Sequence, residues 1–362
     1  MEVVIQRRNI SQFEGLDGLR GIAALGVVFA HANGLFKSYT DDTSSYLVVD
    51  FFYILSGFVI AYAYSSRLDQ GLSWSGFMRL RLNRLYPMLF VGVLVAGLVF
   101  LGRQVLLQTG MITEAVVLTV LSLSLLPVGL LYGLASYPID NPIWSLFFEF
   151  VANGVYASPI RRIGRMSAFV LLGLAIVALT VVAMQFGTLS CLGYVGPDSF
   201  LAGFVRVSVP FSLGVAIWRL KLFERFPSIP FPMLALGLAI VFFFHGSTRW
   251  VYDMAAVLIV FPVIVCFGSR AHVGAFSLRL CHISRRGSYP LYILHMSVLR
   301  TVDMAYKMSH IRIGPFVPMC LAILLSLAVS WGFLRLYDEP FREWMARRRK
   351  NSRLQAARVG AT

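Results

Sequence analysis

Apolar runs of about 20 residues recur along the whole chain, and they restrict its possible folds more than any other feature. One such run is long enough to cross the hydrocarbon core of a bilayer as a helix, which satisfies its own backbone hydrogen bonds. Hydrophobic side chains make up 58% of the 362 residues and charged ones only 14%. These proportions exclude an ordinary soluble domain and a disordered chain. The sequence therefore predicts an all-α, polytopic helical bundle in a membrane.

Nine runs are predicted to cross the bilayer. They cover residues 17–36, 46–64, 144–160, 167–186, 199–218, 231–246, 251–268, 288–306 and 313–337. Two further runs, 85–102 and 115–134, are also long enough, but Arg103 separates them and Pro127 interrupts the second. The positions of the Lys and Arg residues have to decide how many times these two runs cross the membrane.

Lys and Arg collect between the apolar runs, as they do in cytoplasmic loops that face anionic headgroups. The six clusters are Arg7 and Arg8; Arg67, Arg79, Arg81 and Arg84; Arg161, Arg162 and Arg165; Arg219, Lys221 and Arg225; Arg270, Arg279, Arg285 and Arg286; and Arg342, Arg347, Arg348, Arg349 and Lys350. Placing all of them inside requires an odd number of crossings between Arg84 and Asp140. About ten transmembrane helices result, with both termini cytoplasmic. The net charge of +15 thus indicates topology and not nucleic-acid binding.

The chain is predicted to hold one transmembrane domain, residues 1–337, followed by a basic cytoplasmic tail, residues 338–362. Glu339 and Pro340 are expected to end the last helix. The first run resembles a secretion signal, but it contains Arg20 and no small-residue cleavage site follows, so we expect it to stay attached.

Three ionisable residues lie in the first run, where each charge is costly and is therefore a functional candidate. Arg20 and His31 are eleven residues apart, which places them on one helix face about 16 Å apart along the axis. Asp17 lies one turn before Arg20 and can pair with it. Asp17 and Arg20 are equally consistent with a simple cap of the cytoplasmic helix end.

His31 is the best candidate for a catalytic base, because imidazole is the usual general base in acyl and proton transfer. On the predicted topology Asp50 and Glu149 begin their helices from the outer side, at a depth similar to that of His31. A carboxylate orients and stabilises a catalytic imidazolium. The sequence does not decide which of the two contacts His31, and a packed, hydrogen-bonded histidine is the structural alternative.

Two further segments hold polar candidates. Arg81 and Arg84 lie three residues apart at the inner boundary, where a pair of guanidinium groups suits a phosphorylated donor, although basic residues there also serve as plain topological anchors. Tyr292 and His295 lie one turn apart near the start of a span, and Ser56 with Gly57 is expected to serve close helix packing. The chain has no phosphate-binding loop, zinc motif or dinucleotide fingerprint, and its four cysteines show no metal-ligand spacing, so no metal is predicted.

Taken together, five segments resemble the motifs of the acyltransferase-3 family of integral membrane O-acyltransferases. In order they read LDGLRGIAALGVVFAH, VDFFYILSGFVI, RLNRLYP, NPIWSLFFEF and ISRRGSYPLYILH. The resemblance pairs Arg20 with His31, makes Arg81 and Arg84 the cytoplasmic R-x-x-R, and adds Trp144 and Ser145 ahead of an acid. Relatives often carry two adjacent acids there, whereas this chain has Glu149 alone.

The resemblance implies transfer of an acyl group, usually acetyl, from acyl-CoA as a donor substrate to a hydroxyl of a carbohydrate or lipid-linked saccharide. It also implies a multi-pass protein of the bacterial inner membrane, with no bound cofactor. CoA would be held by Arg81, Arg84 and Arg20, while His31, oriented by Glu149 or Asp50, would deprotonate the acceptor or accept the acyl group itself. A transporter or flippase of a lipid-linked saccharide is the alternative, because buried charges also form proton relays.

Overall fold

The computed structural model describes residues 13–37, 43–190, 192–309 and 313–348. The described chain is helical, apart from loops and one isolated bridge between Pro230 and His272. Its α-helices are α1 (Glu14–Phe36), α2 (Val48–Asp69), α3 (Trp74–Leu106), α4 (Ile112–Ser122), α5 (Ile143–Ala157), α6 (Arg165–Phe186), α7 (Gly196–Arg219), α8 (Phe231–Phe243), α9 (Arg249–Ala255), α10 (Phe261–Gly268), α11 (Ala275–Ser309) and α12 (Phe316–Phe333). Two π-helical segments, Ala256–Val260 and Leu334–Asp338, extend α9 into α10 and α12 toward the C-terminus.

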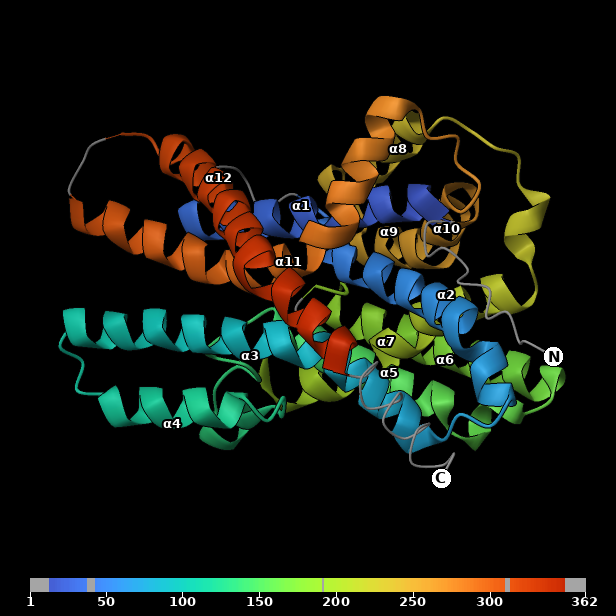
Figure 1. Cartoon of the computed structure of the whole chain (residues 1–362), viewed down its shortest axis with the longest axis horizontal. Coiled ribbons are helices and arrows are strands. Elements are labelled where there is room, and N and C mark those ends of the chain that lie inside the picture. Colours follow the sequence, from blue (N-terminus) through green and yellow to red (C-terminus); the bar gives the residue numbers. More distant parts are fainter. Residues whose placement is uncertain (1–12, 38–42, 191, 310–312, 349–362) are drawn as a thin grey trace, which may run out of the picture.

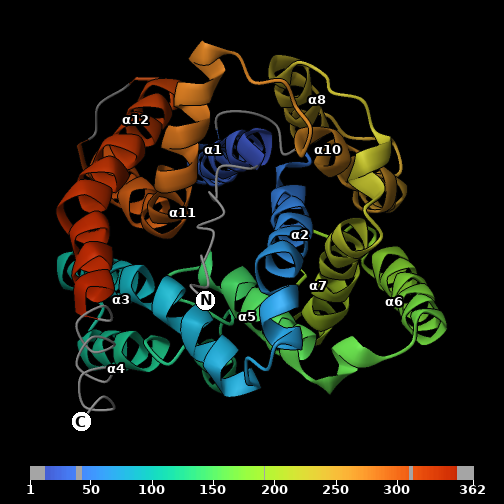
Figure 2. The ribbon, with the colours of Figure 1, turned by 45° about the vertical axis from the view of Figure 1, so that its right-hand side comes forward.

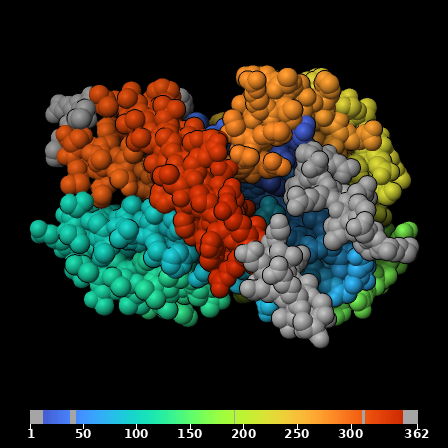
Figure 3. Space-filling model, in the orientation of Figure 1, coloured from blue at the N-terminus to red at the C-terminus, as the bar shows by residue number. Residues whose placement is uncertain are grey.

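The helices form one bundle in which α1 packs chiefly on α11, and α2 on α7. Figure 1 shows α3 beside α4 and α12 crossing obliquely in front of α11. In the space-filling view α12 runs obliquely across the front surface, and the teal surface of α3 and α4 stays visible beside it (Figure 3). The turned view places α6 at the outer edge, next to α7 (Figure 2). α6 is therefore peripheral, with only Leu179 and Ala183 buried.

Seven of the described helices are long and apolar enough to cross a membrane, which confirms the predicted polytopic helical class. They are Glu14–Phe36, Ser45–Asp69, Trp74–Leu106, Arg165–Phe186, Gly196–Arg219, Arg249–Gly268 and Phe316–Arg348. Three shorter apolar helices are α4, α5 and α8. α11 has 35 residues and contains the predicted run 288–306, but its first turns are rich in arginine.

The segment 85–134 differs in form from the two runs that the sequence suggests. α3 begins at Trp74, well before residue 85, with the Ser73 hydroxyl as its N-cap acceptor from the Gly76 amide at 3.1 Å. α4 has 11 residues and rises only about 16 Å, roughly half the hydrocarbon thickness. The arginine pair of α3 therefore lies inside a long helix and not in a loop.

The expected helix end at Glu339 and Pro340 is wrong, because the last helix continues through both residues to Arg348. The π-helical turn just before Pro340 already interrupts the regular hydrogen-bond ladder, so the missing proline N–H costs little there. Ion pairs four residues apart support the turn, from Arg335 to Glu339 at 3.0 Å and from Arg342 to Asp338 at 2.8 Å. The clusters predicted at Arg7 and Arg8, and at Arg349 and Lys350, lie outside the described residues.

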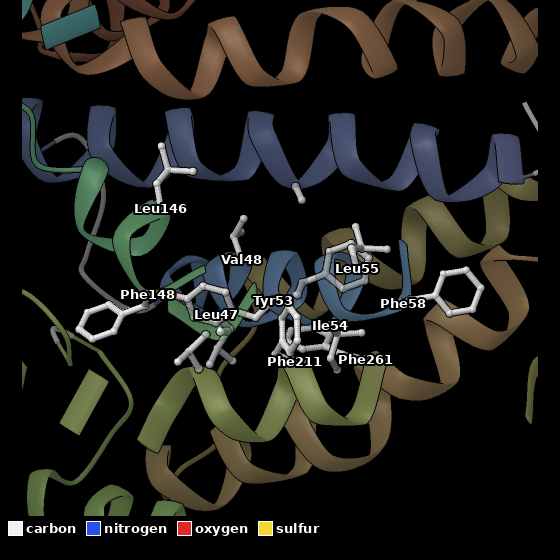
Figure 4. Close-up of a cluster of buried hydrophobic side chains, with 14 of the residues drawn as sticks. Leu47, Val48, Tyr53, Ile54, Leu55, Phe58, Leu146, Phe148, Phe211 and Phe261 are labelled. Atoms are coloured by element: carbon white, nitrogen blue, oxygen red, sulfur yellow. The ribbon is translucent and has the colours of Figure 1, made fainter. Parts of the chain in front are cut away.

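Two helix pairs approach each other so closely that a side chain at the contact would clash. A Cβ at Gly57 of α2 would meet the Phe211 carbonyl oxygen, and one at Gly214 of α7 would meet that of Ile54. On α1, a Cβ at Gly21 would meet Ser284 of α11. Small residues allow such backbone approach between membrane helices, as expected for Gly57. Figure 4 shows the core around α2, where Ile54 and Phe211 belong to one buried cluster.

Candidate active site

The two histidines of the apolar interior form a pair. The Nδ1 atom of His31 lies 2.8 Å from the Nε2 atom of His295, and the two rings stack with centroids 5.1 Å apart. His295 is fully buried, whereas His31 is half-buried. The close packing of α1 on α11 brings them together, although they are 264 residues apart in the chain.

The hydrogen bonds of the pair fix the tautomers when both rings are neutral. The Nδ1 atom of His295 lies 3.0 Å from the Leu291 carbonyl oxygen, and because a carbonyl only accepts, this nitrogen carries the proton. The Nε2 atom of His295 is then an acceptor, so His31 donates its Nδ1–H to it. The Nε2 atom of His31, on the more exposed of the two rings, then carries a lone pair and has no hydrogen-bond partner among the described residues. This is the arrangement of an oriented base.

Arg300 of α11 and Asp140, in the loop before α5, flank the pair. The Arg300 guanidinium donates to the Ile139 carbonyl oxygen at 2.7 Å, and its charge acts on both histidines and on Asp140. Both Asp140 carboxylate oxygens are buried and have no hydrogen-bond partner among the described residues. Burial raises the pKa of Asp140 to about 7, although the Arg300 charge opposes that shift.

Ser145 and Tyr292 connect the start of α5 to α11 beside the histidines. The Tyr292 and Ser145 hydroxyls lie 2.5 Å apart, and both can donate to the Pro142 carbonyl oxygen, at 3.0 and 3.2 Å. The Tyr292 ring is 6.1 Å from that of His295. Both side chains are buried, and their hydroxyls are already used within the protein. The structure thus brings them next to His295 and gives them bonds that hold α5 in place.

Glu149 does not contact His31 in the described structure. Its Oε1 atom accepts from the Ser56 hydroxyl at 2.6 Å and from the Arg81 guanidinium at 3.1 Å. The Arg81 side chain is 4% exposed. Glu149 therefore links α2, α3 and α5. It also forms an ion pair with Arg81, one of the two arginines predicted to hold the donor.

Asp50 is likewise held elsewhere. Its carboxylate accepts two hydrogen bonds from Arg206 of α7, at 2.9 and 2.6 Å, and both side chains are almost fully buried. Arg206 also donates to the Leu192 and Tyr46 carbonyl oxygens. Its guanidinium lies 5.5 Å from the centroid of the Trp144 ring, which gives Trp144 a packing role in this cluster. The predicted contact between a carboxylate and His31 is thus replaced by the contact with His295.

Arginines from four helices gather at the other end of α1. Arg20 forms an ion pair with Asp17 at 3.5 Å. Arg84 of α3 lies close enough to Arg20, Arg81 and Arg342 for their positive charges to act on it. The charge of Arg285 of α11 acts in the same way on Asp17. Arg84 is exposed and makes no ion pair with a described residue. This arginine cluster, Arg20, Arg84, Arg285 and Arg342, is suited to bind phosphate groups.

Sequence reasoning missed Arg206, Arg300 and the role of Ser56. A signal was available for Arg206, because it is an arginine in the middle of an apolar span. No group of three or more His, Cys, Asp or Glu side chains that could hold a metal ion occurs in the described part of the chain.

Comparison with known proteins places most of the chain in one domain. The family model described as an acyltransferase domain matches residues 13–335. The chain is 36% identical over 184 residues to protein 2 in the picA locus of Rhizobium radiobacter. The matched region is 47% of this chain and 94% of that protein.

Two relatives from Staphylococcus aureus cover more of the chain. A putative O-acetyltransferase of strain COL is 25% identical over 93% of this chain and 58% of its own length. The O-acetyltransferase OatA of strain NCTC 8325 is 23% identical over 91% of this chain and 57% of its own length. The chain thus spans little more than half of these two relatives. No solved structure matches it.

Proposed function

Since the chain belongs to the acyltransferase-3 family of membrane acyltransferases, we propose that it is an O-acetyltransferase that moves acetyl from acetyl-CoA to a carbohydrate hydroxyl. The names of two relatives support the reaction type. The observation that carries the proposal is the half-buried His31, whose Nδ1–H donates to His295 and whose Nε2 atom has no hydrogen-bond partner among the residues that the structure describes. The acceptor class we propose is a surface or lipid-linked saccharide.

In the proposed reaction the Nε2 atom of His31 takes the proton of the acceptor hydroxyl. The hydroxyl oxygen attacks the thioester carbonyl carbon, the carbon–sulfur bond breaks, and the leaving CoA thiolate recovers the proton from His31. His295 keeps the His31 ring in the reactive tautomer, as a carboxylate does in a hydrolase triad. Catalysis thus needs neither Asp50 nor Glu149 as the partner of His31.

We propose that the arginine cluster binds the phosphates of CoA, with Arg84 as its main contact. Arg84 is exposed, whereas Arg81 is buried against Glu149. Glu149 and Ser56 then act as positioning groups that hold Arg81, which keeps a second positive charge beside Arg84. Since Arg20 and His31 are about 16 Å apart along α1, the pantetheine arm spans that distance to present the acetyl group.

For the topology we propose ten crossings of the inner membrane with both ends of the chain cytoplasmic. The seven long helices cross with α5, α8 and α11, while α4 does not. α5 and α8 are short, but the loop before α5 is buried by protein at Tyr137, Ile139 and Asp140, and irregular backbone is tolerated at membrane depth where protein buries it. The arginine cluster then faces the cytoplasm, where acetyl-CoA is made.

The reaction is tested with purified full-length protein, acetyl-CoA and an oligosaccharide prepared from the host's surface glycan. We expect free CoA thiol and an acetyl ester on the saccharide to appear in equal amounts, and neither without acceptor. Uptake of the saccharide by proteoliposomes with no release of CoA would identify a transporter instead.

Donor binding should depend more on Arg84 than on other cytoplasmic arginines. We expect Arg84→Ala to weaken CoA binding about 10-fold or more, because a charge-assisted bond to phosphate contributes roughly 1.5–3 kcal/mol. Arg84→Lys should rescue it only in part, since an ammonium group lacks the planar fork. Isothermal titration with CoA measures both, with Arg165→Ala as the matched control. Equal affinities in all four proteins would reduce Arg84 to a topological anchor.

A further inference from the structure

A cavity lies where α6 packs against α7. It has a volume of about 1150 Å³ and is lined by the ends of α2, α5 and α7, the start of α6 and the turns that join them. Figure 2 shows α6 at the periphery beside α7, and only Leu179 and Ala183 of α6 are buried. The cavity therefore lies under a helix that is otherwise exposed.

Positive charge is concentrated at one end of this cavity. Five basic residues line it, Arg161, Arg162, Arg165, Arg219 and Lys221, together with the two acids Asp69 and Glu224. The acids are already paired, Asp69 with Arg161 at 2.5 Å and Glu224 with Lys221 at 3.6 Å. Arg162, Arg165 and Arg219 have no carboxylate partner among the described residues. Their surplus charge is available to an anion.

The other end of the cavity is apolar. Phe169 and Leu172 of α6 and Phe211 and Val215 of α7 line it, up to about 10 Å along α6 from Arg165 at a rise of 1.5 Å per residue. The Ser65 hydroxyl in the lining already bonds the Ala61 carbonyl oxygen and the Tyr156 hydroxyl. Such a wall suits hydrocarbon chains and offers little to the amide groups of a pantetheine arm.

We propose that this cavity binds an anionic phospholipid, with its phosphate on Arg162, Arg165 and Arg219 and its acyl chains against α6 and α7. Basic pockets between membrane helices at the cytoplasmic side bind such headgroups. The arginines stand where the proposed topology puts the inner boundary of the bilayer, which is the depth of a lipid phosphate. The site is separate from the proposed donor site and involves none of its residues.

The test is native mass spectrometry of the full chain in detergent with added phosphatidylglycerol or phosphatidylcholine. We expect retention of phosphatidylglycerol in preference to phosphatidylcholine, and a loss of about 10- to 30-fold in its apparent affinity in the double variant Arg162→Ala/Arg165→Ala. Arg162→Lys/Arg165→Lys should retain most of the binding, since the attraction of a basic pocket for an anionic headgroup depends mainly on the positive charge, which lysine keeps. The matched control is Arg270→Ala/Arg279→Ala, two exposed arginines outside the cavity.

Each variant is first checked for a single symmetric peak in gel filtration, and the lysine pair provides a folded comparison if the alanine pair fails. Equal retention of the two lipids, or equal loss in the control pair, would overturn the proposal. Displacement of the lipid by CoA, with CoA binding lost in the alanine pair and kept in Arg84→Ala, would make this cavity the donor site instead. Because the readout is binding, it is independent of acetyl transfer.

Discussion

Replacing His31 with glutamine should lower acetyl transfer by about 10²- to 10⁴-fold, which is the usual contribution of a positioned general base. Glutamine has nearly the volume of the imidazole and can still donate to the His295 Nε2 atom, but it cannot take the proton of the acceptor. The release of CoA thiol by purified protein measures the loss, and CoA affinity should stay unchanged. Turnover near the wild-type value in His31→Gln would remove His31 from the mechanism.

The role of His295 is separated from general packing by a pair of substitutions. In His295→Gln the side-chain carbonyl can accept the His31 Nδ1–H, whereas in His295→Leu nothing can. If His295 positions the base, the glutamine variant should retain more turnover than the leucine variant at similar thermal stability. Equal activity of the two variants would contradict the tautomer argument.

We expect Asp50→Ala to lose activity because the protein is destabilised, and not because a catalytic group is missing. It would leave the buried Arg206 guanidinium without its carboxylate, and breaking a buried ion pair in this way typically costs about 3–5 kcal/mol. We expect a large fall in the melting temperature in detergent and little recoverable protein. Arg206→Met should be destabilised for the converse reason, because Asp50 then stays buried without its partner.

The double variant Asp50→Leu/Arg206→Met supplies the control. It removes both charges together and should recover part of the lost stability, although the bonds of Arg206 to Leu192 and Tyr46 are gone. Recovered turnover in the double variant would show that Asp50 has a structural and not a catalytic role. A single Asp50→Ala variant that melts like the wild type but has lost turnover would restore Asp50 as a catalytic candidate.

Helix positions were predictable because their cause is local. A run of apolar residues has to form a helix in a bilayer, so the spans beginning near residues 17, 46 and 167 agree with α1, α2 and α6 within a few residues. The end of the last helix at Arg348 was not predictable, because the π-helical turn just before Pro340 depends on the ion pairs around it.

Partners within the site were less predictable than its members. Periodicity places Arg20 and His31 on one face of α1, but it does not say which helix meets that face. The sequence therefore predicted a carboxylate as the partner of His31, whereas in the structure His31 contacts His295, 264 residues away in the chain. Arg206 could have been identified as a candidate from its position in an apolar span. Its ion pair with Asp50 could not have been predicted from the sequence.

The glycine contact between α1 and α11 has a consequence for the geometry of the proposed base. The imidazoles of His31 and His295 belong to different helices, and Gly21 against Ser284 sets the distance between those helices ten residues from the base. Membrane helices meet a change in bilayer thickness by tilting. A change in the angle between α1 and α11 would therefore alter the His31–His295 hydrogen bond that orients the base, without any change to the reacting atoms.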